Sequence, residues 1–406
     1  MKKIIAILVC VVMAAALFTA CAAETPAESS APAEESAETS APAEESAEAS
    51  EPAEGDATGA QDLTIGFYAD AADSYYQVIN DTLNAIAEEA GMNWTIDYKV
   101  GQSTADEQLK AVEDFITAGY DAIIVIQNNV DTTSECIQKC VDAGIPYFGA
   151  CHNFVTADNA SDAAGSVCHD FLQGGIYAGQ DALERGVSKV IMIEGVLGQG
   201  SAGDQTLGFL QAYEDAGKSL GGVTAEELAA NKSQAQLDGT QEIEVVQWAS
   251  GNWAADPAQK AMTDAITALG PDGFDGVYVQ NNPMAEGVIA AMEDAGLNPA
   301  DYWIGSMNGR EISWNWAKEG TITMDVNQSA ALEADVLFQQ ISAYFNGEEY
   351  RQYVHPYLLP YDKDDINEVE ADLIPFSDID NYMSRRADGS IVTDLNDPLF
   401  TDIEGY

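Results

Sequence analysis

From Leu63 to about residue 362, short apolar runs alternate with segments in which apolar residues recur at helical spacing. Leu63–Tyr68 has the pattern of a strand, and the apolar residues after it recur every three or four positions until Gly91. Ala122–Ile126 is apolar without interruption, which is typical of a strand buried on both faces of a parallel sheet. This alternation predicts a doubly wound α/β sheet.

The same alternation restarts near residue 190 and predicts a second unit of the same kind. Further strands are expected at Trp94–Tyr98, Tyr147–Cys151, Val190–Glu194, Ile243–Trp248, Gly276–Val279, Tyr302–Gly305 and Thr321–Val326. Further helices are expected before Gly119 and at Thr132–Ala143, Asp204–Ala216, Pro257–Leu269, Pro283–Ala295 and Ala330–Asn346. The polar stretch 218–242 and the acidic tail 363–406 show no clear period, and the pattern predicts no function for either.

The first 20 residues have the pattern of a bacterial export signal. A short basic start, Met1-Lys2-Lys3, precedes the apolar run Ile4–Leu17, whose length of about 14 residues is too short for the roughly 20 helical residues that cross a bilayer. Small residues and Cys21 close the run, as at the cleavage site of a lipoprotein. We therefore expect a signal peptide at 1–20 and lipid on Cys21. The alternative is an ordinary secreted protein in which this cysteine is free.

Residues 21–61 form an acidic segment of low complexity, in which Ala31–Ser40 is repeated almost unchanged as Ala41–Ser50. Such a segment has too few large apolar side chains to offset the entropy that ordering would cost. Like charges and prolines keep it extended. We expect a disordered stalk that holds a globular domain away from the membrane.

The net charge and the numbers of cysteine and histidine residues exclude several classes of function. The chain has 68 acidic and 16 basic residues, a formal net charge of −52, which repels the phosphates of nucleic acid. Beyond Cys10 and Cys21 it has four cysteines and no CxxC pair, and its three histidines are too few for most metal or acid–base chemistry. We expect no nucleic-acid partner, no cofactor, no metal and no catalysis. Pairing of Cys151 with Cys168 stays open.

Five short motifs occur in an order that is typical of one family. They are Thr64-Ile65-Gly66-Phe67 followed by Tyr75-Tyr76, then Gly119-Tyr120-Asp121-Ala122-Ile123-Ile124, Ala143-Gly144-Ile145-Pro146, Gly174-Gly175-x-x-Ala178-Gly179 and Gln280-Asn281-Asn282-Pro283-Met284-Ala285. With these motifs, residues 62–362 resemble the periplasmic sugar-binding proteins of ABC transporters, of the ribose- and galactose-binding type. Regulators of the lac-repressor type share this fold, but the export signal and the lack of a helix-turn-helix pattern argue against them.

The resemblance implies two doubly wound, Rossmann-like lobes joined by a three-segment hinge, with the ligand between the lobes at the carboxyl ends of the strands. The three crossings are expected near Val167–Asp170, Val326–Gln328 and Gly347–Tyr350. The N-terminal lobe would comprise 62–167 and 327–347, and the C-terminal lobe 168–326 and 348–362, followed by an acidic extension at 363–406.

The resemblance also indicates which residues would bind the ligand. Sugar hydroxyls need fixed polar partners, and the C–H faces of a sugar need flat aromatic surfaces. Carried over by motif, the candidate ligand-binding residues are Asp73, Tyr75, Tyr76, His152, Trp253, Asn281, Asn308 and Asp325.

The chain departs from the family at two of its polar positions. Cys151-His152 stands where the family usually has Asp-Arg, and Gly200–Asp204 lacks the arginine that often precedes the next helix. The usual cationic donors to sugar oxygens are therefore absent at these places. We expect His152 to donate instead, in a pH-dependent way.

Together these features predict a monomeric, lipid-anchored binding protein outside the cytoplasm. It would capture a small polar ligand, a sugar or polyol, by hinge closure and deliver it to an ABC permease. A chemosensory or autoinducer-binding receptor is the main alternative, because a fold alone does not separate transport from sensing. An exported glycoside hydrolase with two carboxylates is the enzymatic alternative, although no nucleophile motif occurs.

Overall fold

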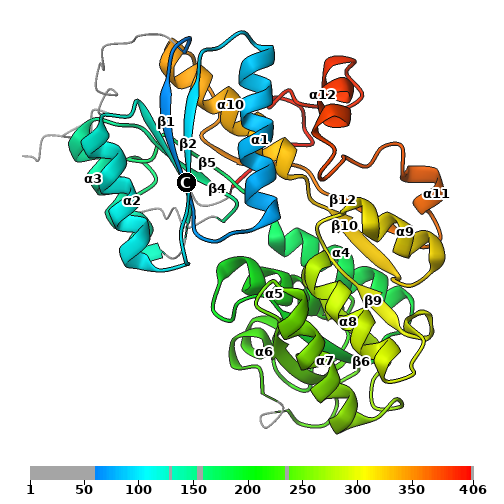
Figure 1. Cartoon of the computed structure of the whole chain (residues 1–406). Helices are drawn as coiled ribbons and strands as arrows, with labels where there is room; N and C mark the ends of the chain where they lie inside the picture. Colours follow the sequence, from blue (N-terminus) through cyan, green and yellow to red (C-terminus); the bar gives the residue numbers. More distant parts are fainter. Residues whose placement is uncertain (1–59, 128–129, 153–158, 234–236, 404–406) are drawn as a thin grey trace, which may run out of the picture. The chain divides into compact units, whose positions relative to one another are not determined.

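The structure, a computed structural model, describes residues 60–403 except 128–129, 153–158 and 234–236. These residues form two α/β lobes, each built on a mostly parallel sheet (Figure 1). The predicted two-lobed α/β fold class is confirmed. The predicted signal peptide, Cys21 and the stalk up to residue 59 lie outside the described residues.

The first lobe is built on a seven-stranded sheet with the order β13-β11-β5-β4-β3-β1-β2. Its strands are β1 (Thr64–Ala69), β2 (Thr95–Val100), β3 (Ala122–Ile126), β4 (Tyr147–Ala150), β5 (Gly165–Val167), β11 (Tyr353–His355) and β13 (Thr401–Asp402). Every side chain of β3 is fully buried, because β3 is a central strand with helices on both faces. This strand was predicted residue for residue.

Helices cover both faces of this sheet. One face packs against α1 (Ser74–Glu89), α10 (Ala330–Asn346) and α12 (Ile379–Ala387), and the other against α2 (Ala105–Ala118) and α3 (Val130–Ala143). The predicted stop of α2 is Gly119, whose φ of 75° is the left-handed conformation that ends helices at low cost for glycine. Two residues of the predicted stalk already belong to this lobe: the Ala60 carbonyl accepts a hydrogen bond from Trp94 Nε1 at 2.7 Å, and Gln61 Nε2 donates to Gly91 O at 2.5 Å.

The second lobe is built on a six-stranded sheet with the order β12-β10-β9-β8-β6-β7. Its strands are β6 (Lys189–Glu194), β7 (Glu244–Ser250), β8 (Gly276–Val279), β9 (Trp303–Gly305), β10 (Met324–Asn327) and β12 (Leu359–Asp362). One face packs against α4 (Phe171–Glu184), α5 (Gly200–Asp215) and α6 (Ala225–Asn231), and the other against α7 (Ala255–Leu269), α8 (Asn282–Asp294), α9 (Glu311–Glu319) and α11 (Ile366–Val369).

The third crossing between the lobes does not lie near Gly347–Tyr350 as expected. Strand β11 pairs in parallel with β5, so residues up to His355 belong to the first lobe, and the chain enters the second lobe only at β12. The assignment of 348–355 to the C-terminal lobe was therefore wrong. The assignment failed because two short strands follow one another here, and a short apolar pattern does not reveal which sheet a strand joins.

The C-terminal tail is ordered and makes a fourth crossing. After α11 in the second lobe the chain returns to α12, which packs against α1 (Figure 1). The described chain then ends in β13, which pairs antiparallel with β11. The stretch 218–242 is also structured. It holds α6, whose capping box joins Thr224 and Glu227, and Lys232 after this helix forms an ion pair with the buried carboxylate of Glu194.

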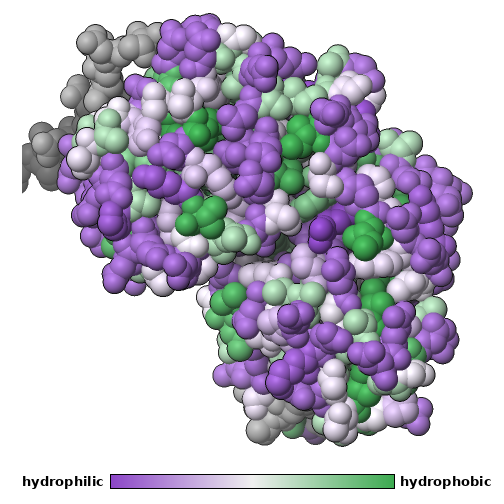
Figure 2. All heavy atoms as spheres, in the orientation of Figure 1, coloured by the Kyte–Doolittle hydropathy of each residue, from purple (hydrophilic) through white to green (hydrophobic). Residues whose placement is uncertain are grey.

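Hydrophilic side chains dominate the visible face of both lobes, as Figure 2 shows, and large exposed apolar residues such as Val100 and Leu197 are scattered. The four described cysteines are buried free thiols, and Cys151 is not bonded to Cys168. Burial raises the pKa of Cys136 to about 11, which makes this thiol unreactive at neutral pH.

Close packing of α4 against α5 explains the glycines of the motif at 174–179. A Cβ atom on Gly175 would lie 2.2 Å from the carbonyl oxygen of Gln205, and one on Gly208 would lie 2.1 Å from the carbonyl oxygen of Leu172. The two helix backbones therefore touch where the first helix of this lobe leaves the hinge.

We expect Gly175→Ala to lower the free energy of unfolding by about 1–3 kcal/mol, because the added methyl group forces the two helices apart. Urea unfolding followed by circular dichroism measures this. Gly203→Ala on α5 is the matched control, since its Cβ meets nothing within 4 Å. Equal midpoints for the two variants would contradict the packing described.

Candidate functional site

A cleft lies where the carboxyl ends of the two parallel sheets face each other, and Figure 2 shows the visible face hollowed between the lobes. Its cavity volume is about 50 Å³, which is smaller than the roughly 300–1,000 Å³ typical of sites for small molecules. It is lined by Asp73, Ser74, Tyr75, Tyr76, Cys151, His152, Phe171, Ser201, Gln205, Trp253, Gln280, Asn281, Pro283, Asn308, Arg310, Gln328 and Phe376.

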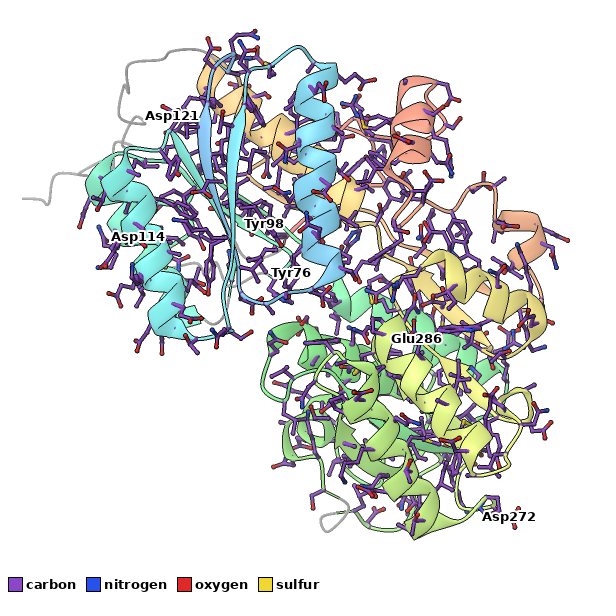
Figure 3. The ribbon with its side chains drawn as sticks, viewed as in Figure 1. Tyr76, Tyr98, Asp114, Asp121, Asp272 and Glu286 are labelled. Carbon is purple, nitrogen blue, oxygen red and sulfur yellow. The ribbon has the colours of Figure 1, made fainter. Side chains whose placement is uncertain are left out.

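The start of α1 forms the first wall of the cleft. Asp73 caps this helix, and its carboxylate accepts a hydrogen bond from the backbone N–H of Tyr75 at 2.7 Å. Burial raises the pKa of Asp73, although this N–H and the positive charge of Arg310 act in the opposite direction. Figure 3 shows Tyr76 at the end of α1 that faces the second lobe.

His152 lies behind Tyr76 at the end of β4. Its Nε2 is 3.1 Å from the Tyr76 hydroxyl, and its ring stacks against Phe171 with a centroid distance of 6.3 Å. Burial lowers the pKa of His152 to about 4, so the ring is neutral at pH 7. The neutral imidazole can still donate one hydrogen bond, but it carries no positive charge.

The hydroxyl of Tyr75 is held from behind by residues that sequence reasoning missed. It donates to Glu333 Oε1 at 2.9 Å and accepts from Gln328 Nε2 at 3.1 Å. Burial raises the pKa of Glu333 to about 8, so this carboxyl group is mostly protonated at pH 7. Glu333 sits within the predicted helix 330–346, where a single glutamate carries no signal of burial.

Trp253 forms the opposite aromatic wall, in the loop after β7. Its Nε1 donates to Gln199 Oε1 at 2.6 Å, and its ring covers Gly195, where any Cβ atom would lie 2.0 Å from the indole. The backbone of Trp253 has a φ of 59°. A bulky residue in the left-handed region is strained, and such strain persists only where the surroundings enforce it.

Left-handed backbone gathers around the cleft. Six described residues other than glycine have positive φ, and Cys151, Trp253 and Asn308 among them line the cleft, while Asn252 is adjacent. Strain of this kind concentrates at functional sites, because it holds side chains in directions that a relaxed loop would not choose.

Asn281 lines the cleft and also stabilises the structure around it. Its Oδ1 caps α8 by accepting from Met284 N at 2.8 Å, and its Nδ2 donates to the carbonyl oxygen of Trp253 at 3.2 Å. The side chain therefore fixes both the helix and the aromatic wall, and its removal would disturb more than one direct contact.

Asp325 does not line the cleft, which corrects its assignment as a direct ligand contact. Its carboxylate is fully buried and accepts from Asn282 Nδ2 at 3.0 Å, Gly309 N at 3.2 Å and the Tyr361 hydroxyl at 2.8 Å. Burial raises its pKa. The group positions the loop that carries Asn308, whose Oδ1 accepts from the backbone N–H of Asn282 at 3.2 Å.

The cleft wall also contains a cationic side chain that the sequence motifs did not indicate. Arg310 follows β9 and is the one arginine or lysine among the described residues that line the cleft. Its Nη1 lies 3.6 Å from Glu286 on α8, which Figure 3 labels. Asp73 on the first lobe and Arg310 on the second thus offer an acceptor and a donor from opposite walls.

Seven of the eight residues selected from the sequence line this one cleft, and Asp325 stands behind it. Sequence reasoning missed Phe171, Ser201, Gln205, Gln280, Arg310, Gln328 and Phe376. In the described part of the chain, no group of three or more His, Cys, Asp or Glu side chains is arranged to hold a metal ion. Within that part, too, no helix is both long and apolar enough to span a membrane.

Comparison with known proteins gives a consistent result. A family model described as a periplasmic binding protein domain matches residues 65–349. The galactofuranose-binding protein YtfQ of Escherichia coli (strain K12) is 24% identical over 257 residues, which are 62% of this chain and 72% of that protein. The xylitol-binding protein of Mycolicibacterium smegmatis (strain ATCC 700084 / mc(2)155) is 25% identical over 244 residues, 60% of this chain and 61% of that protein.

Solved structures show the same fold. The binding protein of the arabinose ABC transporter from Shewanella sp. ANA-3, bound to L-arabinofuranose, superposes with a TM-score of 0.65 at 20% identity and covers 80% of this chain and 97% of its own. A solute binding protein from Bacillus halodurans C-125 with bound myo-inositol gives 0.63 at 21% identity, with 77% and 99% covered. At these identities the likeness concerns the fold alone.

The lowered pKa of His152 predicts a pH dependence of stability. The unfolded chain binds a proton at this residue with a pKa of about 6.5, and the folded chain only near 4, so stability is lost as the pH falls below 6.5. Between pH 7 and pH 5 we expect His152→Gln to lose less stability than the parent, by on the order of 2 kcal/mol.

Thermal unfolding at both pH values measures this difference, and NMR adds a direct readout. The ring C–H resonance of His152 should keep its neutral shift down to about pH 5. A resonance that titrates near 6.5, or equal pH slopes for variant and parent, would show that the ring is not buried as described.

Proposed function

Because the match over residues 65–349 makes this chain a member of the periplasmic binding protein domain family, we propose that it is a lipid-anchored receptor outside the cytoplasm that captures a sugar or polyol and passes it to an ABC permease. The lipid would be carried by Cys21, and the low-complexity stalk would give the receptor reach from the membrane. Closure of the lobes would enclose the ligand.

This proposal rests on the kinds of side chain that line the cleft. Aromatic rings on both lobes, Tyr76 on the first and Phe171 and Trp253 on the second, face a set of amide, hydroxyl and carboxylate groups. Flat apolar faces with fixed polar partners suit a molecule whose ring carries both C–H and O–H groups. The positive φ values of Trp253 and Asn308 support this proposal, because backbone strain is concentrated at functional sites.

The balance of charge favours a ligand without net charge. Asp73 is the one carboxylate and Arg310 the one cation among the described residues of the cleft wall, and they face each other from opposite lobes. An acidic or basic ligand would leave one of them facing a like charge, whereas hydroxyl groups can accept from Arg310 and donate to Asp73. The relatives whose names mention galactofuranose, xylitol, arabinofuranose and myo-inositol agree with this ligand class.

The same wall argues against a glycoside hydrolase. That chemistry needs two carboxyl groups on either side of the scissile bond. Asp73 is the one carboxylate in the described cleft wall, and Asp325 is fully buried behind it and accepts hydrogen bonds from four donors. A binding role without bond cleavage is therefore the better interpretation.

A thermal-shift panel tests the proposal on the full chain. L-arabinose, D-fucose, D-allose, D-fructose, xylitol and myo-inositol are compared with a set of amino acids as the control. A solute at 100 times its Kd stabilises the folded state by about 2.7 kcal/mol, which raises the melting temperature measurably. We expect at least one sugar or polyol to do so. A response to amino acids alone would overturn the ligand class.

For the solute with the largest shift, we expect Trp253→Ala to weaken binding about 10- to 100-fold, because roughly 1.5–3 kcal/mol of aromatic contact is lost. Isothermal titration calorimetry measures the change. Trp316→Ala is the matched control, since it removes an indole of the same lobe that does not line the cleft. Equal affinities for the two variants would remove Trp253 from the site.

A further inference from the structure

The fourth crossing between the lobes belongs to the C-terminal extension, which lies beyond the family match at residues 65–349. Residues 373–378 join α11 of the second lobe to α12 of the first. Leu373 is buried in the core of the second lobe, and the next residue, Ile374, is buried in the core of the first. Adjacent residues of one short segment are thus packed into different lobes.

The backbone of this segment is bonded to the second lobe. The side-chain amide of Asn327 both accepts from Ile374 N at 2.8 Å and donates to Ile374 O at 3.0 Å. The carboxylate of Glu311, at the start of α9, accepts from Phe376 N at 2.9 Å and from Ser377 N at 3.0 Å. Four hydrogen bonds therefore hold the backbone of three residues of this segment, Ile374, Phe376 and Ser377, to one lobe.

The side chains of the same segment are packed into the other lobe. Ile374 is 2% exposed and Phe376 is 3% exposed, both within the core that α1 and α10 form on the first sheet. The ring of Phe376 lies 5.7 Å from the ring of Tyr75, and the guanidinium carbon of Arg310 lies 5.6 Å from its centroid. Phe376 also lines the cleft.

These two sets of contacts cannot both survive a separation of the lobes. A rotation that opens the cleft either pulls Phe376 out of the first core, which exposes apolar surface, or breaks the hydrogen bonds to Glu311 and Asn327. Breaking the two bonds between Ile374 and Asn327 would leave buried backbone groups without partners. We propose that residues 373–378 are a latch that restrains the opening of the cleft and holds Arg310 and Tyr75 in position within its wall. This regulation rests on the proposed function, in which opening and closure admit the ligand.

The latch is tested without a ligand, so that its failure is separate from a failure of the proposed function. Spin labels on a genetically encoded amino acid are placed at the exposed positions Asp114 and Asp272, one on each lobe (Figure 3), in the full chain. Electron–electron double resonance then gives the distribution of distances between the lobes. The variants Phe376→Ala and Glu311→Ala release the two ends of the latch separately.

We expect both variants to broaden the distribution and to shift it to longer distances than in the parent. Glu319→Ala, an exposed glutamate at the other end of α9, is the matched control and should leave the distribution unchanged. Circular dichroism shows whether each variant is folded, and Glu311→Ala keeps the test open if Phe376→Ala does not fold. Distributions that coincide with the control, or a change in folded Phe376→Ala alone, would overturn the latch.

If both variants open the lobes, amide hydrogen exchange gives a second measure. The amides of Phe376 and Ser377 should then exchange faster in Glu311→Ala than in Glu319→Ala, because their acceptor is gone. Equal exchange in the two variants would show that Glu311 does not hold the segment, and the latch would fail on that side.

Discussion

Backbone that passes between two domains has to bury its polar groups beside an interface that must also move. In this protein buried side chains meet that constraint by joining the crossings to one another. The ring nitrogens of His169 on the first crossing lie 3.2 Å from the carbonyl oxygens of Ser329 on the second and Pro356 on the third. Asn327 then joins the second crossing to the fourth through Ile374. The hinge is one connected unit, and the geometry of the cleft depends on it.

Buried polar side chains also hold the residues of the cleft wall in place. One buried carboxylate, Asp325, holds a loop, a helix start and a tyrosine in the second lobe, and the buried Glu333 holds Tyr75 in the first. Groups of this kind are costly to bury, and fixed donors stabilise both of them: Asn282, Gly309 and Tyr361 at Asp325, and Tyr75 at Glu333. The residues that face the cleft are therefore oriented by a layer of polar contacts behind them.

Most of the fold follows from local patterns in the sequence. The strand Ala122–Ile126 and the helix stop at Gly119 were predicted because a continuous apolar run and a left-handed glycine act within a few residues. The helix α6 could have been found from Thr224 and Glu227, which form a capping box. By contrast, nothing local tells that Tyr353–His355 joins the first sheet, since pairing is decided by distant strands.

The candidate site could be predicted where a motif carries it and not where tertiary contacts do. Trp253 and Asn281 follow predicted strands, and strand ends converge in a doubly wound fold. Asp325 was placed in the right region, but the direction of its side chain depends on strand register. Phe376 comes from a tail with no periodicity, and only the return of the chain to the first lobe brings it to the cleft.

The way in which the first lobe is assembled has a consequence for biogenesis. The second lobe is nearly continuous in the chain, whereas the first sheet gathers β1 to β5, then β11, and finally β13 at Thr401–Asp402. A nascent polypeptide emerges with its amino-terminal end first. Strands β1 to β5 of the first lobe are therefore synthesised first, but their sheet remains incomplete until β11 and β13 have been synthesised. The first lobe can finish folding only at the end of translation.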